Sequence, residues 1–294
     1  MMSKASPTSH SYFSQRLRLH YLDWGNDDAP PLLLVHGSRD HCHNWDWLAQ
    51  ELRDEYHIVA PDFRGHGDSE WVRGASYGYS AYIYDLAQLV HQQNLSPVSI
   101  IAHSLGGGVA LRYAGIYPEH IGRMIVIEGA GNWHHDAEPH VKMRQWIEGS
   151  RTASGRLPRR YDSLDDALHR MQAANGHLRE DQARHLTIHG SNRNEDGSYS
   201  WKFDNYTRLM APFDMGPDES RLLWNRIDAP LLLVSGGESW MGQGGKGEGD
   251  KKKSDLTEPF RNATHVTIPN AGHWVHHDQL DAFLTKTREF FVDT

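Results

Sequence analysis

The chain has 294 residues, which is enough for one large α/β domain or for a domain with a substantial insertion. It carries 30 Lys and Arg against 38 Asp and Glu, so its formal charge is −8, and we expect neither nucleic acid nor an anionic membrane as a partner. A single cysteine, Cys42, excludes an intrachain disulfide, and the lack of a signal-peptide core or of roughly 18 consecutive apolar residues leads us to expect a globular, cytoplasmic protein.

Short apolar runs alternate with helix-like segments, which predicts a mostly parallel sheet flanked by helices. Residues 16–22 alternate apolar and polar side chains, as expected of an edge strand. Residues 31–36 (PLLLVH) form the continuous apolar run that is typical of a strand buried on both faces. Further strands are expected at 56–60, 98–102, 124–128, 230–235 and 265–268, and helices at 80–93 and 283–291.

The regular alternation stops between the strand ending near residue 129 and the strand beginning near 230. Ser163 and Asp166 fit a capping-box start for one helix, a second helix is expected near 178–186, and residues 199–203 alternate as in a short strand. We interpret 130–226 as a mainly helical cap inserted between two strands of the sheet. Residues 1–129 and 227–294 then form the core.

Ser104 is the candidate nucleophile, because it lies in AHSLGG between a predicted strand and a predicted helix. The usual nucleophile elbow reads G-x-S-x-G, whereas here Ala102 replaces the first glycine. Alanine satisfies the need for a small side chain provided that its backbone keeps a negative φ. The alternative interpretation is a polar residue in a tight strand-to-helix turn.

A serine hydroxyl needs a base, and His273 is the candidate. It lies in PNAGHWVHH, between the last predicted strand and the last predicted helix, with His276 and His277 close by as competing candidates. Acyl chemistry also needs backbone N–H donors for the oxyanion. We expect them from Leu105, which follows the nucleophile, and from Ser38 in the loop after residues 31–36, with Arg39 as the second choice.

Five short motifs follow one another along nearly the whole chain: His36-Gly37-Ser38, DFRGHGDS at 62–69, AHSLGG at 102–107, PLLLV at 230–234 and Gly272-His273-Trp274. Together they resemble the α/β-hydrolase fold superfamily, and within it the bacterial esterases and serine hydrolase-like proteins, which carry a helical cap inserted after the sixth strand. The resemblance implies Ser104 as nucleophile, His273 as base, a site between sheet and cap, and a structural role for the 62–69 loop.

The acid of the triad has two candidates. Many members of the superfamily carry G-x-x-D after the strand that resembles 230–234, but the position of that aspartate is Ser239 here, and Glu238 lies one residue before it. Other members, including haloalkane dehalogenases and certain lactonases, supply the acid from the position that Glu128 occupies after 124–127. We favour Glu128, because the end of a strand fixes a carboxylate better than a glycine-rich loop does, and keep Glu238 as the alternative.

The remaining site predictions concern metals and the substrate pocket. His41-Cys42-His43 and His134-His135 lack an obvious ligand partner at metal-binding spacing, so we predict no metal site and no cofactor. The substrate pocket is predicted to contain Arg39, His103, Trp133, Trp240 and Trp274. For the aromatic residues of the cap, a structural role in its own small core is an equal alternative.

These features predict a serine hydrolase that cleaves a small-molecule carboxylic ester or lactone through an acyl-enzyme on Ser104. The same triad could instead serve a C–C bond hydrolase or a cofactor-free acyltransferase. A ligand-binding relative without turnover ranks last. The oligomeric state and the acyl-chain length do not follow from the sequence.

Overall fold

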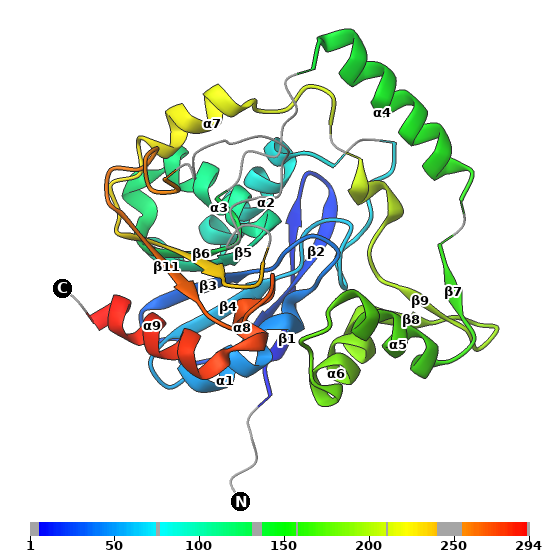
Figure 1. The fold of residues 1–294 in the computed structure, drawn as a ribbon, viewed down its shortest axis with the longest axis horizontal. Helices are drawn as coiled ribbons and strands as arrows, with labels where there is room; N and C mark the ends of the chain where they lie inside the picture. The colour runs from blue at the N-terminus through cyan, green and yellow to red at the C-terminus, as the bar shows by residue number, and fades with distance from the viewer. Residues whose placement is uncertain are drawn as a thin grey trace, which may run out of the picture.

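The computed structural model describes residues 6–74, 77–130, 137–156, 158–209, 211–239 and 255–292. Its centre is an eight-stranded sheet in the order β1-β2-β4-β3-β5-β6-β10-β11 (Figure 1). The strands are β1 (Thr8–Ser14), β2 (Leu17–Asp23), β3 (Pro31–Val35), β4 (His57–Pro61), β5 (Val98–His103), β6 (Ile121–Ile127), β10 (Leu231–Gly236) and β11 (Ala263–Ile268). The pairs from β4 to β11 are parallel, and β1 and β2 add antiparallel pairs, so the sheet is mixed with a mainly parallel core.

The predicted mostly parallel sheet with flanking helices is thus confirmed, with one correction. Residues 16–22 were expected to form an edge strand, but β2 is covered by β1, which the sequence interpretation missed. β1 (TSHSYFS) buries only Tyr12 and Ser14, so it lacks the apolar run that marks the central strands. By contrast, every residue of β10 is buried.

Helices cover both faces of the sheet (Figure 1). One face carries α2 (Tyr79–Gln92), α3 (Leu105–Ile116) and α7 (Pro217–Trp224), whose buried residues join the larger apolar core with Val35, Ile100 and Val126. The other face carries α1 (Asp46–Leu52), α8 (Val275–Asp278) and α9 (Leu280–Val292), which pack on Leu34, Ile101 and Ile125. Alternate residues of β3 and β5 therefore enter opposite cores, as the two-residue period of a strand requires.

The chain between β6 and β10 contains a second group of elements. These are α4 (Pro139–Ser154), β7 (Arg160–Tyr161), α5 (Leu164–Ala174), α6 (Glu180–Gly190), β8 (Ser191–Arg193), β9 (Tyr199–Trp201) and the 3₁₀ turn η3 (Asn205–Arg208). β7, β9 and β8 form a small antiparallel sheet, and Leu168, Leu178, Ala183 and Leu186 form a small apolar core. We call residues 137–209 of this segment the cap. α7 follows them and packs on α3 of the core.

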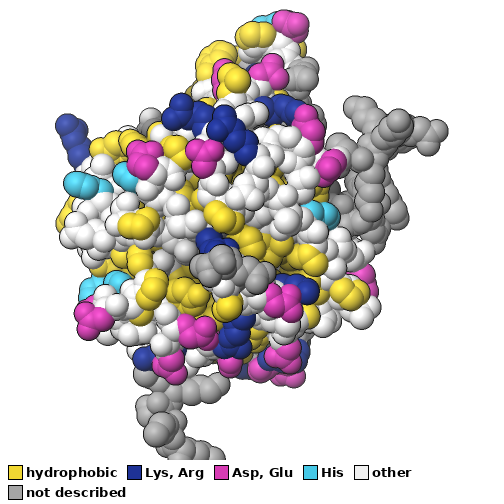
Figure 2. Space-filling model, turned by 90° about the vertical axis from the view of Figure 1, so that its left-hand side faces the viewer, with side chains coloured by type: hydrophobic (Ala, Val, Ile, Leu, Met, Phe, Trp, Pro, Cys, Tyr) yellow, Lys and Arg dark blue, Asp and Glu magenta, His cyan; other side chains and the backbone are white. Residues whose placement is uncertain are grey.

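The surface carries charges of both signs, as expected from 30 basic and 38 acidic residues. Figure 2 shows acidic and basic side chains interspersed on one face, with hydrophobic side chains between them. Among the described helices, none combines the length and the apolar character that crossing a membrane would require.

Candidate active site

Ser104 lies at the sharp turn between β5 and α3, with φ 51° and ψ −116°. This positive φ is strained for a residue with a side chain. The turn is tight because Gly106 approaches the end of β3: a Cβ there would lie 2.5 Å from the carbonyl oxygens of Val35 and His36. Ala102 lies inside the β5 ladder and is fully buried, so its backbone is extended and alanine is compatible with the turn.

Glu128 follows β6, the strand next to β5, and its side chain is completely shielded from solvent. Its Oε1 accepts hydrogen bonds from the amide of Gly236 at 2.8 Å and from Ser239 Oγ at 2.7 Å. Its Oε2 lies 3.4 Å from Nδ1 of His273. The structure therefore brings Glu128 to the imidazole, and the residue at the position of the expected aspartate, Ser239, holds the glutamate in place.

Glu238 occupies a different environment. Its carboxylate is half exposed and forms an ion pair with His177 Nε2 at 3.3 Å, in the segment between α5 and α6. The structure thus separates the two acid candidates: one contacts His273 from the end of a strand, and the other faces the cap.

His273 lies in the loop between β11 and α8, and its ring is about one third exposed. His103, the last residue of β5, donates from Nε2 to the His273 carbonyl at 2.9 Å. Burial, followed by the charge of His273, lowers the pKa of His103 well below its ordinary value, so this ring is neutral at pH 7. Among the described residues, no hydrogen bond joins Ser104 Oγ to the His273 ring, a contact that substrate-free sites often leave open.

The loop after β3 lies directly against the nucleophile. A Cβ on Gly37 would lie 2.8 Å from Nδ1 of His103 and 3.3 Å from Cβ of Ser104, so only glycine fits there. Ser38 and Arg39 follow, and Arg39 has a positive φ of 60°. Leu105 begins α3, where the first amides of a helix have no partner within the helix. The predicted oxyanion donors are therefore both close to Ser104.

The DFRGHGDS loop has the structural role that the resemblance implies. The Asp62 carboxylate accepts hydrogen bonds from the amide of Cys42 at 2.7 Å, from His20 at 2.7 Å and from the amide of Asp68 at 2.9 Å. Burial, the largest single influence, would raise the pKa of Asp62, but the hydrogen bond and charge of His20, the charge of His36 and the amide of Asp68 together lower the pKa below its usual range. Asp62 thus fixes the loop and is already saturated.

A cavity of about 800 Å³ opens between core and cap beside these groups. Ser104, His273, Ser38, His103 and Trp274 line it from the core. From the cap come Met171, Tyr161, Trp201, Phe203 and several arginines. Of the pocket residues expected from the sequence, Arg39, His103 and Trp274 line the cavity, whereas Trp133 and Trp240 lie outside the described residues.

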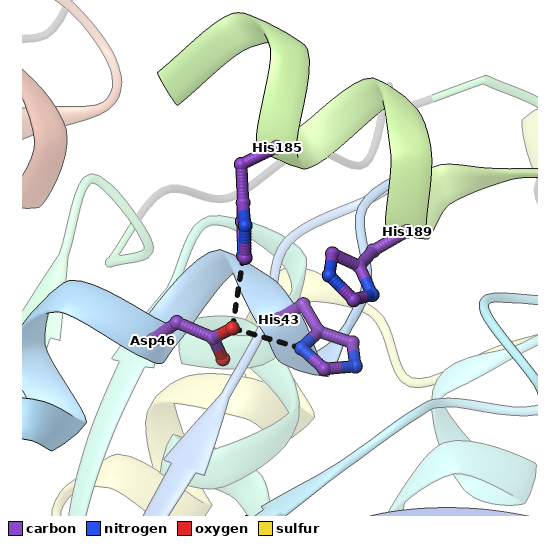
Figure 3. A group of neighbouring side chains, drawn as sticks. All are labelled: His43, Asp46, His185 and His189. Atoms are coloured by element: carbon purple, nitrogen blue, oxygen red, sulfur yellow. Dashed lines mark hydrogen bonds and ion pairs between the residues drawn. The ribbon is translucent and has the colours of Figure 1, made fainter. Parts of the chain in front are cut away.

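A second group of polar side chains joins core and cap near α1 (Figure 3). Asp46 Oδ2 accepts hydrogen bonds from His43 Nδ1 at 2.9 Å and from His185 Nε2 at 2.8 Å. The His189 ring stacks on that of His43 at 3.7 Å. The sequence interpretation considered His43 without a partner at ligand spacing. Asp46, three residues after His43, is such a partner. His185 and His189 on α6 reach this group only through the fold. His134-His135 lies outside the described residues.

Comparison with known proteins agrees with this architecture. The model of the alpha/beta hydrolase family matches residues 32–285. Esterase Rv0045c of Mycobacterium tuberculosis is 26% identical over 274 residues, covering 91% of this chain and 84% of the relative. Esterase YbfF of Escherichia coli is 25% identical over 270 residues, covering 90% and 93%. The solved thioesterase domain from the curacin biosynthetic pathway superposes with a TM-score of 0.84 at 19% identity, covering 96% of this chain and 99% of that domain.

The chain belongs to the alpha/beta hydrolase family, because the family model spans most of its length. The esterase relatives support a hydrolase, and the resemblance inferred from the five motifs is confirmed at this level.

Proposed function

We propose that the protein is a serine hydrolase that cleaves a carboxylic ester or lactone through an acyl-enzyme on Ser104. The observation that carries the proposal is the contact of 3.4 Å between His273 and the fully buried Glu128, at the edge of the same cavity that Ser104 lines. A buried carboxylate on Nδ1 fixes the tautomer in which Nε2 can accept a proton.

In this mechanism, His273 removes the proton of Ser104 as Oγ attacks the ester carbonyl. The amides of Leu105 and Ser38 donate hydrogen bonds to the oxyanion of the tetrahedral intermediate. The imidazolium then gives its proton to the leaving alcohol, and the acyl group remains on Ser104. Water, deprotonated by His273, attacks the acyl carbonyl, and His273 returns that proton to Oγ of Ser104 as the acid leaves. Glu128 stabilises the imidazolium throughout without taking the proton.

A fluorophosphonate probe tests the nucleophile, because it forms a phosphonyl ester only with an activated serine. We expect one label per chain, located on Ser104 by peptide mass spectrometry, and its loss together with p-nitrophenyl butyrate hydrolysis in Ser104→Ala. Ser154→Ala, an exposed serine on α4, is the matched control and should label normally. Labelling that persists in Ser104→Ala would refute the assignment.

A further inference from the structure

The cavity beside Ser104 is lined by an unusual number of cations. Five arginines contribute to it: Arg39 from the loop after β3, Arg156 and Arg159 after α4, Arg170 from α5 and Arg208 from η3. Among the described residues that line this cavity, none is an aspartate or a glutamate. This is unexpected in a chain with a formal charge of −8.

These guanidinium groups are also unpaired. Within the described part of the chain, none of the five forms an ion pair or a side-chain hydrogen bond; Arg159 stacks over the Tyr161 ring at 5.1 Å. All five residues are exposed to the cavity or to solvent. Other arginines of the cap differ, since Arg160, Arg179 and Arg184 each pair with a carboxylate.

Arg39 lines the same cavity as Arg208 and Arg170 and is close enough to both for their charges to act on it. Burial, followed by the charges of Arg208 and Arg170, lowers the pKa of Arg39 from its ordinary value. Arg39 and Arg208 also line an adjoining cavity of about 490 Å³ that reaches Ser104 and Leu105. Among the described residues that line it, Asp214 is the one carboxylate, and it already accepts hydrogen bonds from the amides of Tyr79 and Met215. An anion between the arginines would remove their repulsion and accept their paired N–H groups.

We propose that the substrate is an ester with a carboxylate or phosphate group in its acyl or alcohol part, and that the arginines of the cavity bind this group. The inference rests on the proposed function, since it names the substrate class of the same site. The guanidinium fork matches either oxyanion, so the shared chemistry is an anionic oxygen group. Placing it against Arg39 and Arg208 would hold the scissile carbonyl near Ser104.

Matched ester pairs test this inference. The first compares p-nitrophenyl hemiglutarate with its neutral methyl ester, which places the charge in the acyl part. The second compares 1-butyrylglycerol 3-phosphate with 1-butyrylglycerol, which places it in the alcohol part. We expect kcat/KM at least tenfold higher for the anionic member of one pair or both, and a smaller preference at high salt.

Variants of the cavity arginines complete the test. Arg208→Gln and Arg170→Gln should each lower the anionic-to-neutral ratio of kcat/KM at least fivefold, whereas Arg151→Gln, on α4 outside the cavity, should preserve it. Equal or faster turnover of the neutral member in both pairs would overturn the inference while leaving the serine mechanism intact. If Ser104→Ala hydrolyses the neutral esters as fast as the parent protein does, the proposed function fails instead.

A separate observation concerns the polar group in Figure 3. The ligand-type atoms of His43, Asp46, His185 and His189 all lie within 4.8 Å of one another. His185 and His189 are four residues apart on α6 and so share one helix face, while His43 and Asp46 come from the core at η1 (Cys42–Trp45) and α1. The group therefore spans the junction of cap and core.

The electrostatics of this group suit a cation. Asp46 Oδ1 is shielded from solvent and accepts no hydrogen bond from any described residue. The His189 ring stacks on that of His43 at 3.7 Å, which places its nitrogens beside the carboxylate. Nδ1 of His43 and Nε2 of His185 lie 2.9 and 2.8 Å from Asp46 Oδ2, and all four ligand atoms lie within 4.8 Å of one another, which brackets the spacing of about 3.3 Å around tetrahedral zinc.

We infer that His43, Asp46, His185 and His189 bind a transition-metal ion of the zinc type, which links the cap to the core. Three imidazoles and one carboxylate form a four-coordinate set of the kind that zinc accepts. The other two candidate groups offer less. In the group of His20, Cys42 and Asp62, both oxygens of Asp62 already accept hydrogen bonds. The group of Asp23, Asp27 and His57 provides only one imidazole.

The test uses the protein without a histidine tag, after removal of metals by EDTA. At a free Zn²⁺ concentration a hundredfold above Kd, we expect Tm to rise by about 5 °C or more. Co²⁺ should give the intense visible bands of a tetrahedral complex at one ion per chain. The variant His185→Asn/His189→Asn should lose both responses, and His169→Asn, an exposed histidine of α5, should keep them.

Two outcomes would refute the metal site. One is a Zn²⁺-dependent rise of Tm that is unchanged in the double variant, which would place the ion elsewhere among the 21 histidines. The other is a Co²⁺ titration of the parent protein without tetrahedral bands, which does not depend on any variant folding correctly.

Discussion

The carboxyl ends of the central strands and the cap line the same cavity, but the two regions are built differently. At the carboxyl ends of the strands, the amide of Ser104 donates to the carbonyl of Ile127 at 2.9 Å, and the amide of Glu128 donates to the carbonyl of Val234 at 2.9 Å. In the cap, α4 has no buried residue and the apolar core consists of four small or medium side chains. The proposed reacting groups are thus fixed by the backbone of three strands, whereas the opposite wall is lightly packed.

The largest expected effect separates the two acid candidates, one from each region. Glu128→Gln should lower kcat for p-nitrophenyl butyrate by about 10³- to 10⁴-fold, because the imidazole loses its orienting charge. Glu238→Gln, the matched change on the side of the cap, should change kcat less than about threefold. Steady-state kinetics decide between them, and a large loss in Glu238→Gln alone would reverse the assignment of the acid.

A cap substitution tests whether the cap opens independently. Leu186 is completely buried in the cap core, so Leu186→Ala should cost about 3 kcal/mol. Hydrogen exchange should show this loss mainly in the amides of α6, with little change in β5. Leu222→Ala, at a 72% exposed position, is the control. Equal loss of protection in β5 would show that cap and sheet unfold as one unit.

The tight turn between β5 and α3 should not accommodate a side chain at Gly106. Gly106→Ala would place a Cβ 2.5 Å from two backbone oxygens, so we expect a destabilisation of about 2 kcal/mol in urea unfolding. Gly176→Ala is a suitable control, since a Cβ there has no neighbour within 4 Å. If both variants have the same free energy of unfolding, the close approach of α3 to β3 is not required.

Buried histidines should make stability fall in acid. Burial is the main cause that lowers the pKa of His36 and His41 to about 4 and that of His66 and His277 to about 3. The unfolded chain takes up these protons near pH 6.5, so stability present above pH 6.5 declines as the pH falls toward 4. Each residue contributes up to about 1.4 kcal/mol per pH unit. Urea unfolding between pH 7.5 and 5 measures this slope, and a flat profile would contradict it.

The smallest effect is expected for the residue that holds the acid. Ser239→Ala removes one of the two hydrogen bonds to Glu128 Oε1 but leaves the amide of Gly236 in place. We expect kcat to fall about three- to tenfold, because the carboxylate that orients His273 loses one of its donors. Ser239→Thr, which keeps the hydroxyl, should restore most of the activity.

The central strands could be predicted because each is a run of apolar residues buried on both faces. β1 and α4 could not, because β1 buries only Tyr12 and Ser14 and α4 has no buried residue. The preference for Glu128 came from its position at the end of a strand. The role of Ser239 could not be predicted from the sequence, because it depends on β6 and β10 being neighbours in the sheet.

The cavity arginines illustrate another limit. They lie at positions 39, 156, 159, 170 and 208, so their shared location depends on how the cap folds over the sheet. The same holds for His43 and His189, which lie far apart in sequence and stack at 3.7 Å. No local pattern in the sequence contains such long-range contacts.

The position of Glu128 also bears on how this protein could change over time. With the proposed acid after β6, the connection between β10 and β11 does not supply a residue to the chemical step. Within the described part of this connection, Ser239 keeps the contact that fixes the acid, 2.7 Å from Oε1 of Glu128. An acid on β6 therefore places fewer demands on the sequence of this connection than an acid within it would, provided that Ser239 is kept.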